Sequence, residues 1–192
     1  MNNMADLALI LKALDFASHR HRAQHRKGTR KIPYINHPIQ VASLLANEGG
    51  EADPVLLTAA IIHDVIEDTV DSVEERSELI YEISKVFGEE ILDLTLEVTD
   101  DKTLEKKVRK QLQIDQANHK SVRAKKLKIA DKITNLRDII IDPPDWWSHE
   151  RIVEYIGWSE KVVEGLKGVS PELESIFNRT LSEAKDKYLS NK

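Results

Sequence analysis

The segment 63–68 reads HDVIED and follows directly on a long apolar run. Burying several ionisable side chains is costly unless a partner neutralises them, and a metal ion is the usual partner. If one helix continues through the segment, its turn of about 100° per residue places the histidine and the three acids on one side. These residues are His63, Asp64, Glu67 and Asp68. We therefore predict a single helix that carries both metal ligands and acids able to handle water.

Two further candidate ligands lie elsewhere in the chain. His37 directly precedes a predicted helix, and Asp131 lies in a helix with an apolar face. Together with His63 and Asp64 they offer two imidazoles and two carboxylates. Mixed nitrogen and oxygen ligands without sulfur suit Mn²⁺, Fe²⁺ or Co²⁺, with Zn²⁺ as an alternative. Taken singly, however, a buried histidine or aspartate is more often a hydrogen-bonded core residue than a ligand.

The composition restricts the classes of protein to which the chain can belong. It has 192 residues with 41% hydrophobic and 32% charged residues, as expected for one globular domain with a substantial core. The absence of cysteine excludes disulfides, thiolate ligands and a cysteine nucleophile. The net charge of −5 does not favour nucleic acid or anionic lipid as a partner, so any anion site must be a local basic patch. With no secretory signal and no membrane span, we expect a cytoplasmic protein.

Helix signals recur along the whole chain, whereas strand signals are scarce. Five residues with good capping side chains predict helix starts: Asp53, Ser72, Ser121, Ser148 and Ser170. We predict an all-α protein of roughly nine helices in a single domain, residues 1–192, with a short hairpin near residues 31–35 left open. The predicted helices cover about residues 5–24, 38–45, 54–68, 73–87, 89–98, 104–117, 122–141, 149–168 and 171–188.

Four strings occur in the order found in a known family. They read YINHP from residue 34, HDVIEDT from residue 63, VTDDK from residue 98 and ADKITNLRD from residue 130. The order H…HD…D resembles the HD-domain metal-dependent phosphohydrolases, and the strings resemble the hydrolase domain of RelA/SpoT-type proteins. The chain is too short for the synthetase, TGS and ACT regions of the long members. It is therefore similar to the stand-alone small alarmone hydrolases, the metazoan SpoT homologues and their bacterial relatives.

The resemblance implies roles for the candidate residues. Glu67 and Asp68 match the pair that orients and deprotonates the attacking water, although a surface ion pair on the helix is the alternative. The residues that match the ligands of a single Mn²⁺ ion are His37, His63, Asp64 and Asp131.

The resemblance also implies a nucleotide pocket. Arg26 and Lys27 match a pair near the base and sugar, and Asn135 matches a residue near the ribose and the scissile phosphate. Lys102 and Tyr155 match positions that line the pocket. The other cations of the basic stretch from residue 20 to 31 are expected to belong to a solvated loop. For Trp146 and Trp147, we favour anchoring of their loop over stacking on a base.

The predicted activity is metal-dependent hydrolysis of the 3′-pyrophosphate of (p)ppGpp, which gives GDP or GTP and pyrophosphate. A small-molecule nucleotide is therefore the expected partner, and the oligomeric state is left open. The nearest alternative is an HD phosphohydrolase that acts on another nucleotide, such as NADPH. A helical nucleic-acid-binding module that uses residues 20–31 is an alternative from another class, and it predicts binding without a metal. The intact set of candidate ligands argues against a catalytically inactive scaffold.

Overall fold

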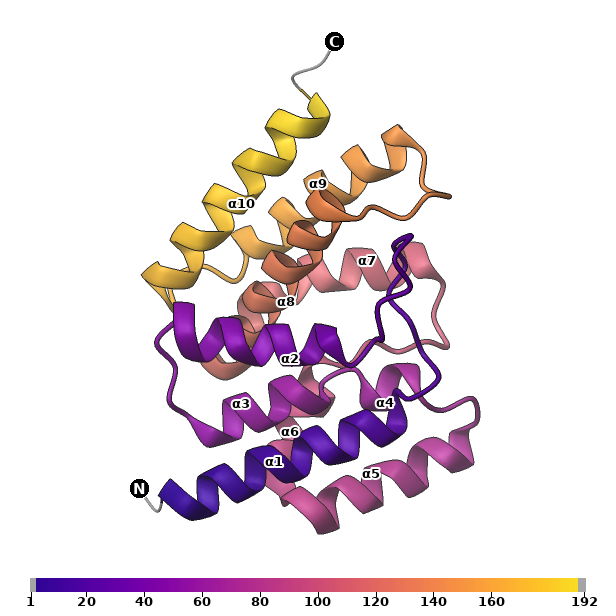
Figure 1. The fold of residues 1–192 in the computed structure, drawn as a ribbon, viewed down its shortest axis with the longest axis vertical. Coiled ribbons are helices and arrows are strands. Elements are labelled where there is room, and N and C mark those ends of the chain that lie inside the picture. The colour runs from indigo at the N-terminus through magenta and orange to yellow at the C-terminus, as the bar shows by residue number, and fades with distance from the viewer. Residues whose placement is uncertain (1–2, 190–192) are drawn as a thin grey trace. The chain divides into compact units, whose positions relative to one another are not determined.

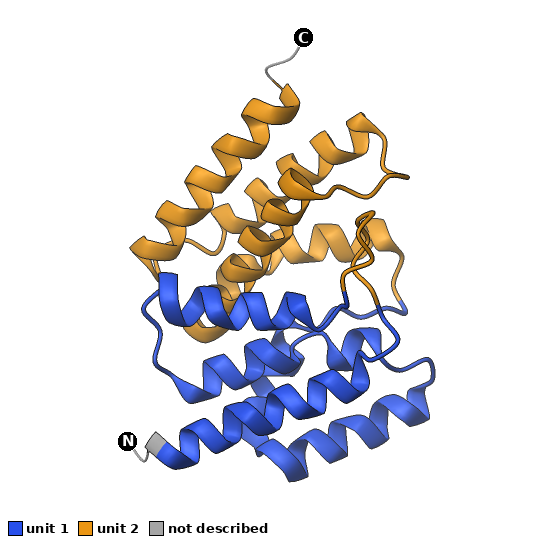
Figure 2. Ribbon diagram, in the orientation of Figure 1, with its two compact units in different colours: residues 1–24, 33–103 blue, residues 25–32, 104–192 orange. Residues whose placement is uncertain are grey.

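The computed structural model describes residues 3–189, and its regular structure over that range is entirely helical. This confirms the predicted all-α class. The chain divides into two compact units: unit 1 comprises residues 1–24 and 33–103, and unit 2 comprises residues 25–32 and 104–192 (Figure 2). Between residues 3 and 189, no helix combines the length and the apolar character needed to cross a membrane.

Unit 1 is arranged around one apolar helix, α3. Helices α1, α2 and α6 each pack against it (Figure 1), and its residues 58–62 are all buried. Asp53 caps its start as predicted, because its carboxylate accepts a hydrogen bond from the backbone N–H of Val55 at 3.0 Å. The elements of unit 1 are α1 (Asn3–Arg20), α2 (Asn36–Ser43), the π-helical turn η1 (Leu44–Glu48), α3 (Pro54–Ile62), α4 (Val65–Asp68), α5 (Val73–Phe87) and α6 (Glu89–Val98).

The predicted continuous helix over residues 54–68 is wrong. Helix α3 ends at Ile62 and α4 begins at Val65, so His63 and Asp64 lie in the turn between them. Asp64 has φ −93° and ψ −6°, in the sparsely populated bridge region where many active-site residues are found. The break divides one expected helix into two, which accounts for ten α-helices in the described range where nine were predicted.

Unit 2 is arranged around α8, on which α9 and α10 pack, while α7 packs against α9 (Figure 1). Ser121 and Ser148 cap α8 and α9 as predicted, by accepting hydrogen bonds from the backbone N–H groups of Ala124 and Arg151. Its elements are α7 (Lys106–Asp115), the 3-10 turn η2 (Ala117–His119), α8 (Val122–Ile141), α9 (His149–Glu164) and α10 (Pro171–Leu189).

The loop 25–32 belongs to unit 2, where the residue after α8 holds it. The carboxylate of Asp142 accepts hydrogen bonds from the Thr29 hydroxyl at 2.6 Å and from the backbone N–H groups of Thr29 and Arg30, both at 3.2 Å. The Arg26 N–H closes the loop by donating to the Ile32 carbonyl at 2.8 Å. Within residues 3–189 no β-strand forms, and only the single bridge residues His25 and Pro33 remain of the hairpin that the sequence left open.

Candidate functional site

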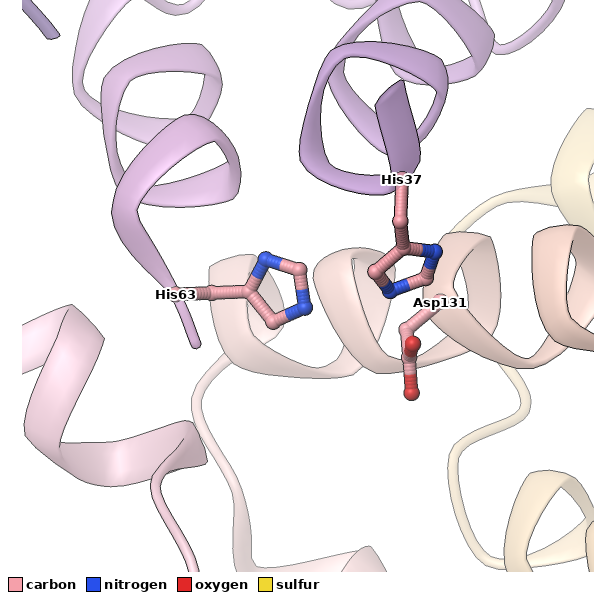
Figure 3. A group of neighbouring side chains, drawn as sticks. All are labelled: His37, His63 and Asp131. Atoms are coloured by element: carbon pink, nitrogen blue, oxygen red, sulfur yellow. The ribbon is translucent and has the colours of Figure 1, made fainter. Parts of the chain in front are cut away.

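In unit 1, three of the predicted ligands lie together. His37 is the second residue of α2, His63 follows α3, and their ring centroids are 5.4 Å apart (Figure 3). The two imidazoles are only 1% and 6% exposed. The Oδ2 atom of Asp64 lies 3.1 Å from Nε2 of His63 and 3.6 Å from Nε2 of His37. Two ring nitrogens of buried imidazoles and one carboxylate oxygen of Asp64 thus lie close together in unit 1.

The hydrogen bonds around these side chains orient them for a cation. Nδ1 of His63 lies 2.8 Å from the carbonyl oxygen of Ala60, which can only accept, so Nδ1 donates its proton there and Nε2 is the nitrogen left to face a cation. The Tyr34 hydroxyl donates to Oδ2 of Asp64 at 2.6 Å. A neutral imidazole and a hydrogen-bonded carboxylate are the donors that divalent metals of intermediate softness prefer. The residues present therefore fit such an ion.

Tyr34 has its own support in unit 1, and sequence reasoning assigned it no role. Its ring centroid lies 4.8 Å from that of the buried His21, and Nδ1 of His21 lies 2.6 Å from the side-chain oxygen of Gln24. The Gln24 amide in turn donates to the backbone carbonyl of Asp68. The available signal was the place of Tyr34 at the start of the string YINHP, three residues before His37.

Glu67 of α4 is an acid of unit 1 whose pKa is strongly raised. Burial, then the charge of Asp64 and then that of Asp100, raise the pKa of Glu67 from 4.5 to about 7. Its Oε2 atom accepts a hydrogen bond from the backbone N–H of Asp100 at 3.1 Å, which fixes the carboxyl group. A carboxyl group that titrates near neutrality can both accept and return a proton under ordinary conditions.

Asp68 lies one residue further on α4 and differs from Glu67 in its surroundings. Its carboxylate forms an ion pair with Lys102, and 28% of its side chain is exposed. Both residues were predicted for the site, and the structure brings them together within unit 1. The ion pair places the Lys102 ammonium group beside α4.

In unit 2, a second group of predicted residues is linked through α8. Asp131 is buried, and its carboxylate accepts hydrogen bonds from the Asn135 amide at 2.6 Å and from the Lys132 ammonium at 2.9 Å. The Asn135 oxygen accepts a bond from Arg26 at 2.8 Å, and Nε of Arg26 donates to Asp138 at 2.8 Å. Asp131, Asn135 and Asp138 follow the i, i+4, i+7 spacing of one helix face, a signal that could have identified Asp138.

Tyr155 of α9 is the last predicted residue of unit 2. Its ring lies 5.5 Å from that of Trp147 and 5.3 Å from that of Trp158, measured between centroids. Burial is the main cause that raises the pKa of the Tyr155 phenol. Trp147 thus packs against the next helix, as expected for a loop anchor, whereas the side chain of Trp146 is 59% exposed. Figure 3 labels Asp131 of α8 and the two histidines of unit 1.

Comparison with known proteins identifies the family. A model of the HD domain matches residues 13–150. The guanosine-3′,5′-bis(diphosphate) 3′-pyrophosphohydrolase MESH1 of Xenopus tropicalis is 46% identical over 170 residues, which make up 88% of this chain and 91% of the relative. MESH1 of Homo sapiens is 46% identical over the same shares of the two chains.

A solved structure supports the same placement. It belongs to a metazoan ortholog of SpoT that hydrolyzes ppGpp and plays a role in starvation responses. The two structures have a TM-score of 0.85 and 40% sequence identity, over 92% of this chain and 95% of the other. The chain therefore belongs to the HD-domain family and, within it, to the group of the MESH1 proteins.

Proposed function

We propose that this protein is a metal-dependent hydrolase that removes the 3′-pyrophosphate of (p)ppGpp, giving GDP or GTP and pyrophosphate. The likeness to enzymes of that name over nearly the whole chain carries the proposal. The HD-domain match over residues 13–150 contains every candidate ligand and acid. The two units act together as one hydrolase domain, residues 1–192.

The proposed ligands of one Mn²⁺ ion come from both units. His37, His63 and Asp64 are supported by their convergence in unit 1. Asp131 is supported by its burial and by the Asn135 amide, which orients its carboxylate. These residues would hold a divalent cation, which would supply charge neutralisation for a phosphate and a lowered pKa for bound water.

Glu67 is the proposed proton acceptor. Its carboxyl group is held by the Asp100 N–H, and its burial, the first cause of a pKa of about 7 in the metal-free protein, favours uptake of a proton from water. Asp68 orients the water, and its ion pair with Lys102 fixes it in place while leaving an ammonium group for the substrate phosphates. No covalent enzyme intermediate is required.

The remaining proposed contacts lie in unit 2 and hold the nucleoside. Arg26 is fixed by Asn135 and Asp138, which leaves its planar guanidinium oriented for stacking on a base. Lys27, Asn135 and Tyr155 are the other proposed contacts. On the family resemblance, the enzyme is cytoplasmic and acts on a small nucleotide, without a nucleic-acid or membrane partner.

The test is a comparison of two substrates on metal-free protein to which Mn²⁺ is added back. We expect release of pyrophosphate from ppGpp only after the metal is added, and a lower kcat/KM for phosphate release from NADPH. Absence of pyrophosphate release with any divalent metal would refute the proposed function. Faster turnover of NADPH than of ppGpp would show that NADPH is the preferred substrate.

A further inference from the structure

Helix α4 carries the two acids of the proposed mechanism, yet it has only four residues, Val65–Asp68. The N–H of Asp68 donates to the Asp64 carbonyl at 2.8 Å, and the next N–H along the chain donates to the Val65 carbonyl at 3.2 Å. So short a helix closes too few internal hydrogen bonds to hold its own position. Contacts from outside α4 therefore decide where its two acids lie.

Gln24 holds the end of α4. Its side-chain N–H donates to the backbone carbonyl of Asp68, one of the carbonyls that the end of a helix leaves without an internal partner. The side-chain oxygen of Gln24 lies 2.6 Å from Nδ1 of His21. A backbone carbonyl can only accept, so the Gln24 nitrogen faces Asp68 and its oxygen accepts from Nδ1 of His21. The amide is thus oriented from both sides.

Tyr34 holds the start of α4. Asp64 directly precedes the helix, and the Tyr34 hydroxyl donates to its Oδ2 atom at 2.6 Å. The Tyr34 ring packs on that of His21, with centroids 4.8 Å apart, and its backbone N–H donates to the Gln24 carbonyl at 2.9 Å. These contacts at the two ends of α4 come from one group of residues, His21, Gln24 and Tyr34, which we call the bracket.

The place of His21 in the bracket is not explained by packing alone. His21 is only 1% exposed, and its Nε2 atom is buried without a hydrogen-bond partner among the described residues. A buried polar atom without a partner destabilises a fold, and a phenyl ring would fill the space without that cost. A phenyl ring would lack the Nδ1–H group, however, and this is the group that orients Gln24.

The two ends of α4 carry different chemistry in the proposed function. The metal ligand Asp64 lies at its start, and Glu67 and Asp68 lie at its end. We propose that the bracket residues are positioning residues that set the separation between this ligand and the acids that handle water, with Gln24 acting on the acids. The inference rests on the proposed function. Its expected effect on rate is large, because a displacement of about 1 Å can lower turnover 10²-fold.

Gln24→Met tests the inference, because methionine keeps the length of the side chain and removes both hydrogen bonds of the amide. We expect kcat for ppGpp to fall by roughly 10- to 100-fold. KM and the Kd for Mn²⁺ should each stay within about twofold, because the bond from Tyr34 to Asp64 remains. Gln40→Met, at an exposed position of α2, is the matched control and should leave all three values unchanged.

His21→Phe is a milder second variant. It keeps a ring against Tyr34 and removes the Nδ1–H donor, so kcat should fall by roughly three- to tenfold. The double variant should lose no more than Gln24→Met alone, because both changes act through the same amide. Independent, additive losses would show that His21 does not act through Gln24.

Hydrogen exchange in metal-free protein gives a readout that is independent of turnover. The amides of Asp68 and Thr69 close α4, and in Gln24→Met they should exchange about tenfold faster, while those of α5 keep their rates. A wild-type kcat, a loss that falls only on KM, or unchanged exchange at α4 would overturn the inference. If the wild type fails to cleave ppGpp, the proposed function fails, while hydrogen exchange still decides whether Gln24 holds α4.

Discussion

Asp64 is the residue on which the described polar contacts of unit 1 converge. Its Oδ2 atom lies near a nitrogen of each of two buried imidazoles and accepts the Tyr34 hydroxyl. An oxygen shared in this way is restrained in position before any ligand arrives. Residues that hydrogen-bond to metal ligands commonly change metal affinity by 10- to 100-fold when they are replaced.

Replacing Tyr34 with Phe tests this restraint. The variant loses the hydrogen bond to Asp64 but keeps the ring that packs on His21, so we expect the Kd for Mn²⁺ to rise about tenfold with little loss of fold. Titration calorimetry on metal-free protein measures the change. Tyr81→Phe is the control, because Tyr81 is 65% exposed. Equal affinities in the two variants would assign Tyr34 to packing alone.

Glu67 gives a prediction about the pH dependence of stability in metal-free protein. Its folded pKa of about 7 lies above the ordinary value of 4.5, so the folded state favours the protonated acid. The associated stability is present below about pH 4.5 and is lost as the pH rises toward 7. Glu67→Gln cannot ionise, so its stability relative to the wild type should increase across that window, by at most about 3 kcal/mol.

Urea unfolding at pH 5 and pH 8, with a chelator present, measures this difference. Glu74→Gln, at an exposed position of α5, is the control, and its effect on stability should be the same at both pH values. A constant difference between wild type and Glu67→Gln would show that Glu67 does not titrate in this window. With metal bound, we expect Glu67→Gln to lower turnover by about 10²-fold or more, the scale of lost acid–base catalysis.

At the scale of elements, the loop 25–32 positions Arg26 and Lys27 through its attachment to Asp142. Gly28 is essential to this attachment, because a Cβ atom there would lie 2.7 Å from the carbonyl oxygen of Asp142 and closer still to its carboxylate. The carboxylate can rotate, but the backbone oxygen cannot, so the loop would have to move.

We therefore expect Gly28→Ala to raise KM for ppGpp about tenfold, with a loss of stability of roughly 1–3 kcal/mol. Steady-state kinetics and thermal unfolding measure the two effects. Gly157→Ala is the matched control: it lies in α9 with nothing within 4 Å of its Cβ, so alanine there should be neutral or stabilising. A wild-type KM in Gly28→Ala would show that the loop does not need this close approach.

The elements also show what a sequence can and cannot reveal. Helix starts at Asp53, Ser121 and Ser148 were predictable, because a capping side chain bonds to backbone two or three residues away. The break at His63–Asp64 was not predictable, since neither proline nor glycine marks it and it depends on tertiary packing. The bond from Arg26 to Asp138 spans 112 positions, a separation that no local pattern encodes.

At the scale of the whole molecule, the proposed ligand set draws residues from both units, so metal binding should stabilise the entire fold. At a free Mn²⁺ concentration of about 100 Kd, the gain is about 2.7 kcal/mol, which corresponds to a rise in Tm of roughly 5–10 °C. Asp131→Asn should lose most of this rise, and Asp186→Asn, exposed on α10, should keep it. If Asp131→Asn kept the full metal-induced rise in Tm, Asp131 would not be a metal ligand.

The division of the chain into units has a consequence for protein engineering. Unit 2 takes eight residues, 25–32, from within the stretch that otherwise forms unit 1. No single cut can therefore separate the two units as continuous fragments. A fragment ending at residue 103 would keep Arg26 and Lys27 but lose Asp138 and Asp142, which hold their loop. Split-protein or chimera designs should transfer the loop 25–32 together with residues 104–189.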